Sequence, residues 1–334
     1  PLQLPLQLPL QLPLQLPLQL PLQPSIVSYR NMIGAILTTL FFALSAVTGQ
    51  RVAIQLGSIW GNAVRLFIAA FVLGLIVLLA WPDSVGGAPF LWFLLSGVVG
   101  FGVGDVALFL AYERIGSRLT ILLNLCLAPL FAMGLEWAWL GNGISWSIAI
   151  CAAITLVGVT MALRPRANSS QKMTRRGNFG FGVVCAIVAG FGQGTGAVIS
   201  RKAEEVAIEV GMTINGISAA FQRVLAGFLF AAVMVVLIRL FSKSKSWKQW
   251  GNPLDRKLAP WLLGAALFGP VIGVSCFQWA LSNLQGGIVL AIVATTPIVM
   301  IPLAAWNEND HPSRLAIAGA FVAVAGVVLL NVVA

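Results

Sequence analysis

The chain has 334 residues, of which 59% are hydrophobic and only 9% are charged. Soluble globular domains carry about 25% charged residues, so this composition excludes an ordinary water-soluble fold. The net charge of +10 does not indicate a nucleic-acid partner, because the Lys and Arg residues lie in short segments between apolar stretches. Basic residues in that position are typical of membrane topology and of contact with anionic membrane lipids.

The chain begins with a low-complexity tract. Residues 1–24 are six tetrapeptides, five PLQL and one PLQP, and Met32 opens the first apolar stretch. Proline at every fourth position prevents a helix, and the tract has neither the basic start nor the apolar centre of a signal peptide. We expect residues 1–31 to be extended or disordered, and either upstream of the true start or a dispensable tail.

Ten apolar stretches follow, and each is long enough to cross the roughly 30 Å hydrocarbon core of a bilayer as a helix. Backbone polar groups must be paired in lipid, which leaves helices or a closed barrel. Barrel strands alternate in polarity, whereas runs such as GLIVLLA do not. The sequence therefore predicts an all-α integral membrane protein with ten transmembrane helices, at about 31–49, 59–80, 90–111, 119–140, 144–163, 179–199, 217–240, 260–281, 287–306 and 314–333.

The second half of the chain repeats the first. The positions that recur in the same order are Gly100 and Gly104 as Gly269 and Gly273, Arg65 as Arg223, Pro129 as Pro297, and Gly158 as Gly326. Since five crossings is an odd number, the second copy must be inverted relative to the first. Two inverted five-helix repeats are an architecture of secondary transporters, which hold the substrate between the repeats.

A polar segment, 164–178, separates the first repeat (32–163) from the second (179–334), and it contains five basic residues. Basic residues are concentrated in every second connection between spans, above all in this linker and in 241–259. By the positive-inside rule we expect these connections in the cytoplasm and both chain termini outside. The protein would then be a multi-pass protein of the cell membrane, the inner membrane in a Gram-negative cell.

Charged residues inside the spans are the leading site candidates, because each costs about 2.5–3.5 kcal/mol at the centre of a membrane helix. Arg65 and Asp105 lie at similar depths, about 9 and 10 Å from the same membrane face. We expect them to pair or to share a polar pocket, with Asp105 as a candidate proton carrier. Arg223 and Glu136 form a looser counterpart near the opposite face. The alternative is that both arginines reach the lipid headgroups and Glu136 is interfacial.

Uncharged polar residues in or near the spans are candidates for binding a small polar substrate, although hydrogen bonds between helices explain each equally well. They are Tyr112, Asn124, Gln193, Gln222 and Gln278, and Trp279 is a candidate cavity wall.

Prolines and glycines within the spans predict where helices bend and approach closely. Pro129 and Pro297 should kink their helices and free backbone carbonyls. Thr295 and Thr296 would either join a site there or cap those carbonyls. The pairs Gly100 and Gly104, and Gly269 and Gly273, are expected to be packing positions.

Signatures of catalysis and cofactor binding are lacking in the sequence. Its one histidine is His311, and its four cysteines have no metal-ligand or redox spacing. The glycine-rich run GFGQGTGA is not followed by the Lys-Ser/Thr of a phosphate-binding loop. We therefore expect no metal, no cofactor and no enzymatic activity.

The order and duplication of three motifs resemble the EamA-type branch of the drug/metabolite transporter superfamily over about 32–334. The motifs are an Arg early in the second span of each repeat (NAVRLFIAA, AAFQRVLAG), a Pro in the fourth (LAPLFA, TTPIVM) and a Gly-rich end of the fifth (LVGVTMAL, VAGVVLLN). The resemblance implies a ten-helix transporter of small metabolites that works without nucleotide hydrolysis.

Two features depart from that family pattern. The acid that usually follows the fourth span is present as Asp310 in the second repeat, but Asn142 stands at the first position. Family members are also usually drawn with cytoplasmic termini, opposite to the orientation that the loop charges predict.

We therefore predict a secondary transporter of a small metabolite or drug-like solute that works by alternating access between the repeats. It would be a monomer or homodimer and would use protons, another coupling ion or simple exchange. The alternative is a non-catalytic membrane scaffold or a lipid-interacting subunit.

Overall fold

The structure, a computed structural model, describes residues 29–140, 146–163, 177–241, 251–284, 286–308 and 311–333. Within these ranges it contains helices and no strands, which confirms the all-α prediction for this part of the chain. The low-complexity tract, most of the linker, Asn142 and Asp310 lie outside the described residues, and what the sequence predicts for them stays a prediction.

The first repeat consists of one long helix pair followed by broken and bent helices. Its elements are α1 (Tyr29–Leu56), α2 (Ser58–Ala80), the short η1 (Pro82–Ser84), α3 (Phe90–Gly97), η2 (Val98–Gly104), α4 (Asp105–Leu140) and α5 (Trp146–Ala162). The second repeat follows the same order with α6 (Phe179–Glu209), α7 (Gly216–Phe241), α8 (Ala259–Ala266), η5 (Leu267–Gly273), α9 (Val274–Asn283), α10 (Gly286–Val293), α11 (Thr296–Glu308) and α12 (Arg314–Val333).

Seven helical segments in the described residues are long and apolar enough to cross a membrane. They are Met32–Leu56, Ser58–Ala80, Phe90–Trp139, Phe179–Glu209, Gly216–Phe241, Ala259–Asn283 and Ile288–Glu308. Two shorter apolar helices, Trp146–Ala162 and Arg314–Leu330, close the two repeats.

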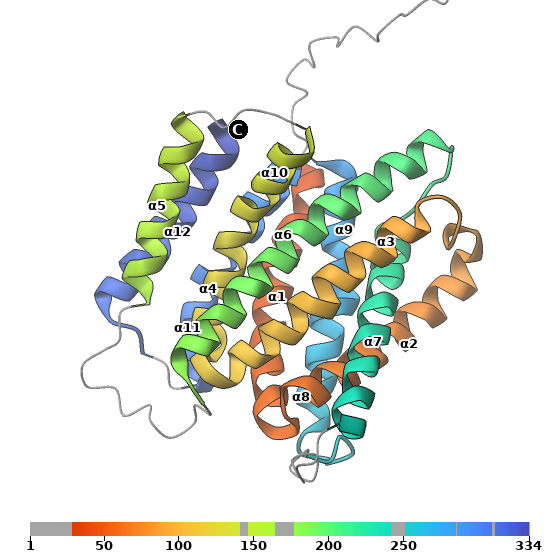
Figure 1. Cartoon of the computed structure of the whole chain (residues 1–334), viewed down its shortest axis with the longest axis horizontal. Coiled ribbons are helices and arrows are strands. Elements are labelled where there is room, and N and C mark those ends of the chain that lie inside the picture. Colours follow the sequence, from red (N-terminus) through yellow and green to blue (C-terminus); the bar gives the residue numbers. More distant parts are fainter. Residues whose placement is uncertain are drawn as a thin grey trace, which may run out of the picture.

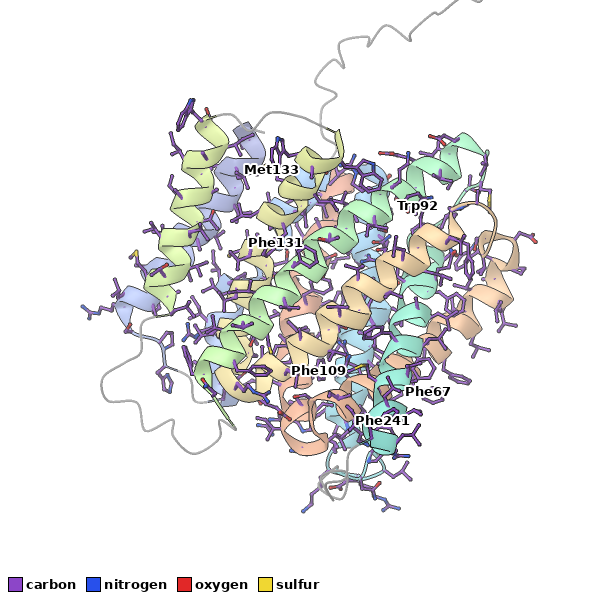
Figure 2. All side chains as sticks on the ribbon, viewed as in Figure 1. Phe67, Trp92, Phe109, Phe131, Met133 and Phe241 are labelled. Atoms are coloured by element: carbon purple, nitrogen blue, oxygen red, sulfur yellow. The ribbon has the colours of Figure 1, made fainter. Side chains whose placement is uncertain are left out.

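The outer surface of the bundle is apolar. On α2, Phe67, Phe71 and Leu75 follow one another at intervals of four residues, and each is more than half exposed. The opposite face of α2 buries apolar residues such as Leu66 and Leu73, so most of the helix surface is apolar, as in a membrane helix. Figure 2 shows such side chains around the bundle, with Phe67 and Phe241 labelled. These helices indicate a multi-pass membrane protein.

The longest segment, Phe90–Trp139, reverses direction at Gly116. This glycine has φ 79° and ψ 169°, a left-handed φ that a residue with a side chain rarely adopts. Contacts with α6 show the reversal, because they run antiparallel before the bend and parallel after it. The neighbours are Gly100 with Gly196 and Gly104 with Gly192 before the bend, and Asn124 with Gly190 and Ala128 with Gly194 after it.

Helices at equivalent positions of the two repeats pack against each other in opposite directions. The α2–α7 pair and the α5–α12 pair lie at opposite sides of the molecule in Figure 1. Their antiparallel contacts are Trp60 with Arg239, Phe67 with Phe228 and Gly74 with Phe221 in the first pair, and Thr155 with Gly326, Gly158 with Ala323 and Ala162 with Gly319 in the second.

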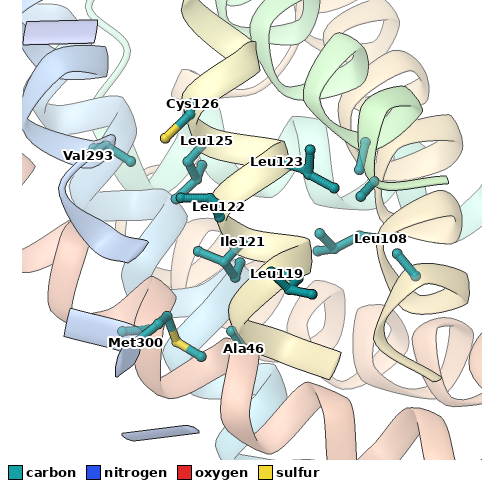
Figure 3. Packing of buried hydrophobic residues seen from close by; sticks show 14 of the residues in the cluster. Ala46, Leu108, Leu119, Ile121, Leu122, Leu123, Leu125, Cys126, Val293 and Met300 are labelled. Carbon is teal, nitrogen blue, oxygen red and sulfur yellow. The ribbon is translucent and has the colours of Figure 1, made fainter. Parts of the chain in front are cut away.

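Part of the interior is built around the second half of α4. Its buried residues, including Leu122 and Cys126, contribute to a core that also contains Ala46 of α1, Val293 of α10 and Met300 of α11 (Figure 3). Elements of both repeats therefore share one apolar core.

The α4–α6 contact depends on glycine, because backbone atoms of the two helices touch there. A methyl group on Gly194 would overlap the carbonyl oxygen of Ala128 and lie 3.0 Å from the backbone nitrogen of Ala132. We expect Gly194→Ala to lower the thermal unfolding midpoint of the protein in detergent, because separating packed helices costs about 1–3 kcal/mol.

Gly134→Ala is the matched control, since Gly134 also lies in α4 but has no atom within 4 Å of the added methyl group. Alanine is favoured over glycine in a helix by about 1 kcal/mol, so the unfolding midpoint of Gly134→Ala should equal or exceed that of the wild type. A Gly194→Ala midpoint at or above that of the wild type would show that the close approach is not required.

Candidate functional site

A polar cavity lies between the two repeats. Its volume is about 50 Å³, which is room for a few water molecules, and its walls come from α1, α2, η2, α4, α6, α7, η5 and α9. Six of the charged or polar residues singled out in the sequence line it, together with Gly269; the six are Arg65, Asp105, Tyr112, Asn124, Gln193 and Arg223. Both repeats therefore contribute polar groups to one cavity.

The paired-glycine segments beside this cavity are wound as π turns. In η2 the N–H of Asp105 donates to the carbonyl of Gly100, and in η5 the N–H of Val274 donates to the carbonyl of Gly269. Each bond reaches back five residues instead of four. Such turns are rare and often occur at functional sites. Here they lie at equivalent places in the repeats, and the first of them ends directly at Asp105.

Arg65 and Asp105 form a buried ion pair. The Nη2 of Arg65 donates to Oδ2 of Asp105 and also, over 2.9 Å, to Oδ1 of Asn62 one turn earlier on α2. The guanidinium carbon lies 4.6 Å from the ring centroid of Phe109. Arg65 is only 4% exposed, so it does not reach the lipid headgroups. The structure thus places the two residues together, as the sequence predicts.

Arg223 occupies the equivalent position in α7 but has a neutral partner. Its Nη1 donates to Oε1 of Gln278 over 2.5 Å, and Nε2 of Gln278 donates to the hydroxyl of Ser200 over 2.6 Å. The ring centroid of Phe101 lies 5.4 Å from the guanidinium carbon. Arg223 is 2% exposed, so protein and not lipid surrounds its side chain.

The first glycine of each π turn makes room for the arginine of the other repeat. A methyl group on Gly100 would lie 3.3 Å from Nη2 of Arg223, and one on Gly269 would lie 3.2 Å from Nη1 of Arg65. The second glycines pack as the sequence predicts, Gly104 against Gly192 and Gly273 against Phe42. The GxxxG pairs therefore serve two purposes, helix contact and the placement of a guanidinium group.

The family assignment rests on a match that covers both repeats. A model of the EamA-like transporter family matches residues 30–164 and 180–332. The chain belongs to the EamA-like transporter family. No curated protein matches the sequence. A crystal structure described only as that of a protein aligns with 91% of this chain and 97% of its own, at a TM-score of 0.58 and 17% identity, and this likeness concerns the fold alone.

In this EamA-like protein Glu136 is not the partner of Arg223. Its carboxylate lies 4.0 Å from Arg201, near the end of α6, and its side chain is 40% exposed. It lines a separate pocket with Arg201 and Lys202. The prediction that Arg223 and Glu136 form a counterpart to the Arg65–Asp105 pair is therefore wrong. Glu136 lies near the exposed end of α4, whereas Arg223 is buried at the cavity.

Five other predicted residues do not line the cavity, and one of them, Gln278, is the partner of Arg223 described above. Gln222 is fully buried and donates to the backbone carbonyls of Ser84 and Ser218, which fixes η1 to α7. Trp279 is 39% exposed and packs beside Gly34 and Gly216, so it is not a wall of this cavity. The hydroxyls of Thr295 and Thr296 donate to the backbone carbonyls of Ile292 and Val293. Of the two roles predicted for these threonines, the structure therefore shows the capping of carbonyls.

The two prolines differ in their effect. The ninth span is broken between Val293 and Thr296, so Pro297 lies in the first turn of α11, where a missing N–H is tolerated. The fourth span continues as a helix through Pro129, and the non-helical dihedral angles within α4 occur at Gly116 instead.

Sequence reasoning missed several groups around the arginines. Asn62 lies three residues before Arg65, and that helical spacing was a usable signal. Ser200 and Phe101 contact the Arg223 site from other helices, and no spacing in the sequence indicates those contacts.

The buried ion pair gives a direct stability test. Arg65→Met leaves the Asp105 carboxylate without its cation, and breaking a buried pair costs about 3–5 kcal/mol. We expect this variant to have a lower thermal unfolding midpoint, and a second change, Asp105→Leu, to restore much of it. Lys202→Met, at an exposed pair with Glu205, should have little effect. A double variant that is less stable than Arg65→Met would contradict this account.

Proposed function

We propose that the protein is a secondary transporter that moves a small metabolite or drug-like solute across the cell membrane by alternating access between its two repeats. The observation that carries this proposal is the polar cavity between the repeats, with one buried arginine from each of them at its wall. Transporters built from repeats bind their substrates near the midplane at such an interface. In this proposal the chain acts without a cofactor and is not an enzyme.

Two observations support ten crossings arranged as inverted repeats. The reversal at Gly116 divides the 50-residue segment Phe90–Trp139 into two limbs, and the two shorter apolar helices add one crossing to each repeat. Equivalent helices, α2 with α7 and α5 with α12, pack antiparallel. A twofold axis in the membrane plane produces that relation.

Movement between two states requires an interface that can shift. The contacts of α6 with η2 are made largely by small residues, such as Gly192 with Gly104 and Gly196 with Gly100, so helices slide there without large side chains having to withdraw. The cavity in this structure is too small for most metabolites, which fits a closed state that must open toward either side. Asp105, the carboxylate on its wall, is our candidate for carrying a coupling proton.

The scaffold alternative leaves the central features unexplained. A protein that only packs against lipids or partners gains nothing from two buried arginines, because charged groups inside a membrane are costly and mark substrate or ion pathways. No feature of the described residues specifically favours a scaffold over a transporter.

Solute counterflow in proteoliposomes tests the transport function. Vesicles loaded with unlabelled amino acids, organic acids, nucleobases, sugars or amines should accumulate the labelled form of at least one class. Asp105→Asn should reduce that uptake by about tenfold or more, because a hydrogen bond to a buried charged group is worth about 1.5–3 kcal/mol. Asp83→Asn is the control, since Asp83 is exposed in η1. Full uptake by Asp105→Asn would refute the assigned role.

Cysteine labelling tests the inversion and the orientation. Asp83 and Lys257 lie in equivalent connections of the two repeats, and both are exposed. An impermeant maleimide should label Asp83→Cys in intact cells and Lys257→Cys only after permeabilisation, because equivalent loops of inverted repeats face opposite sides. The native cysteines are buried or half-buried. Labelling of both from one side would rule out inversion, and the reverse pattern would rule out outside termini.

A further inference from the structure

The charges on the cavity wall do not cancel. Arg65, Arg223 and Asp105 are the charged residues that line it. The carboxylate of Asp105 accepts a hydrogen bond from Arg65 and forms its ion pair there. Among the residues that the structure describes, no carboxylate is paired with Arg223. One positive charge is therefore left on the wall of the cavity.

Arg223 is only partly compensated for a buried cation, because Asp105, whose charge also acts on it, is bound by Arg65. Arg223 is 2% exposed, its one hydrogen-bonding partner is the neutral amide of Gln278, and its Nε is buried without a partner. An uncompensated charge in a protein interior is strongly unfavourable. A cation that is kept in such a place is best explained by an anion that binds and leaves during the working cycle.

The rest of the wall indicates the shape of that anion. Phe42, Phe101 and Phe277 provide apolar surface, and the amide oxygen of Asn124 is a buried acceptor without a partner. A strongly hydrated inorganic ion would gain nothing from three aromatic rings. The cavity has a volume of only about 50 Å³ in this state, so a compact molecule requires less opening between the repeats than a long-chain lipid does.

We propose that the cavity binds a small organic anion, a carboxylate with a compact apolar body, whose charge is bound by Arg223. This inference rests on the proposed transport function, because it names the chemical class of the solute carried. Arg65 is less available for the same task, since its guanidinium group is already held by Asp105 and Asn62. A cationic solute would meet the unpaired Arg223 and find the one carboxylate already engaged.

Gln278→Glu is the sharpest variant, because it gives Arg223 a permanent carboxylate partner without removing the arginine. The new side chain has the same shape, and the hydroxyl of Ser200 can donate to it instead of accepting. We expect this variant to keep or raise the unfolding midpoint of the protein while weakening the binding of an anion by about tenfold or more. If Gln278 only supported the structure, the unfolding midpoint and the binding of the anion would change together.

The probes are butyrate, butyramide and butylamine, which match in size and differ in charge. Binding to the purified protein is measured by calorimetry at constant ionic strength, and counterflow of each probe is measured in parallel. Asn283→Asp is the matched control, since it makes the same amide-to-acid change at an exposed position of α9. Arg223→Gln, checked for its unfolding midpoint, is the second test, with the exposed Arg239→Gln of α7 as its control.

Butyrate should bind the wild type more tightly than the other two probes, and Gln278→Glu and Arg223→Gln should lose that preference. Equal or tighter binding of butylamine or butyramide would overturn the inference, as would unchanged butyrate binding by Gln278→Glu. Tighter binding of inorganic phosphate than of butyrate would show that the ligand is not an organic anion. Tighter binding of dodecanoate than of butyrate would show that the ligand is not compact. Butyrate that binds without being carried would leave the anion site intact and refute transport of this solute class.

Discussion

Close backbone contact between helices of different repeats is the constraint on which the rest of the structure depends. Lipid provides no hydrophobic drive for helix association, so helices are held by packing at small residues and by internal polar contacts. The approach of Gly194 to Ala128 and of Gly158 to Ala323 brings the elements together without intervening side chains. The same absence of side chains at Gly100 and Gly269 leaves the space that Arg223 and Arg65 occupy. Packing and the polar cavity thus have one structural origin.

The two halves have the same architecture but different chemistry. Asp105 and Val274 both follow the π turn of their repeat, and Phe109 and Gln278 occupy equivalent positions further along. As a result Arg65 has a carboxylate and the ring of Phe109 as neighbours, whereas Arg223 has a neutral amide in place of both and takes its aromatic neighbour, Phe101, from the other repeat. The divergence of these few positions, and not the shared fold, decides the charge at the cavity.

Much of this organisation could be predicted from the sequence, because apolar spans, recurring glycines and charged residues in membrane helices are strong local signals. The depth of Arg65 and Asp105 was sufficient to predict their pairing. The expected depth of Glu136 in the membrane did not predict its partner correctly, because depth does not show which side of a helix faces the interior. The link from Arg223 through Gln278 to Ser200 depends on how three helices are rotated relative to one another, and the π turns that set part of that rotation have no sequence signature.

Each π turn also holds one more residue than an α-helical path of the same rise would need. If the turn at η2 rewound to α geometry, the helix beyond it would rotate by about 100°, the angle of one residue in an α-helix. Asp105 is the first residue past that turn, so the rotation would swing its carboxylate out of reach of Arg65. A helix that contains such a surplus residue is able to exchange one set of partners for another without being dislodged from the bundle.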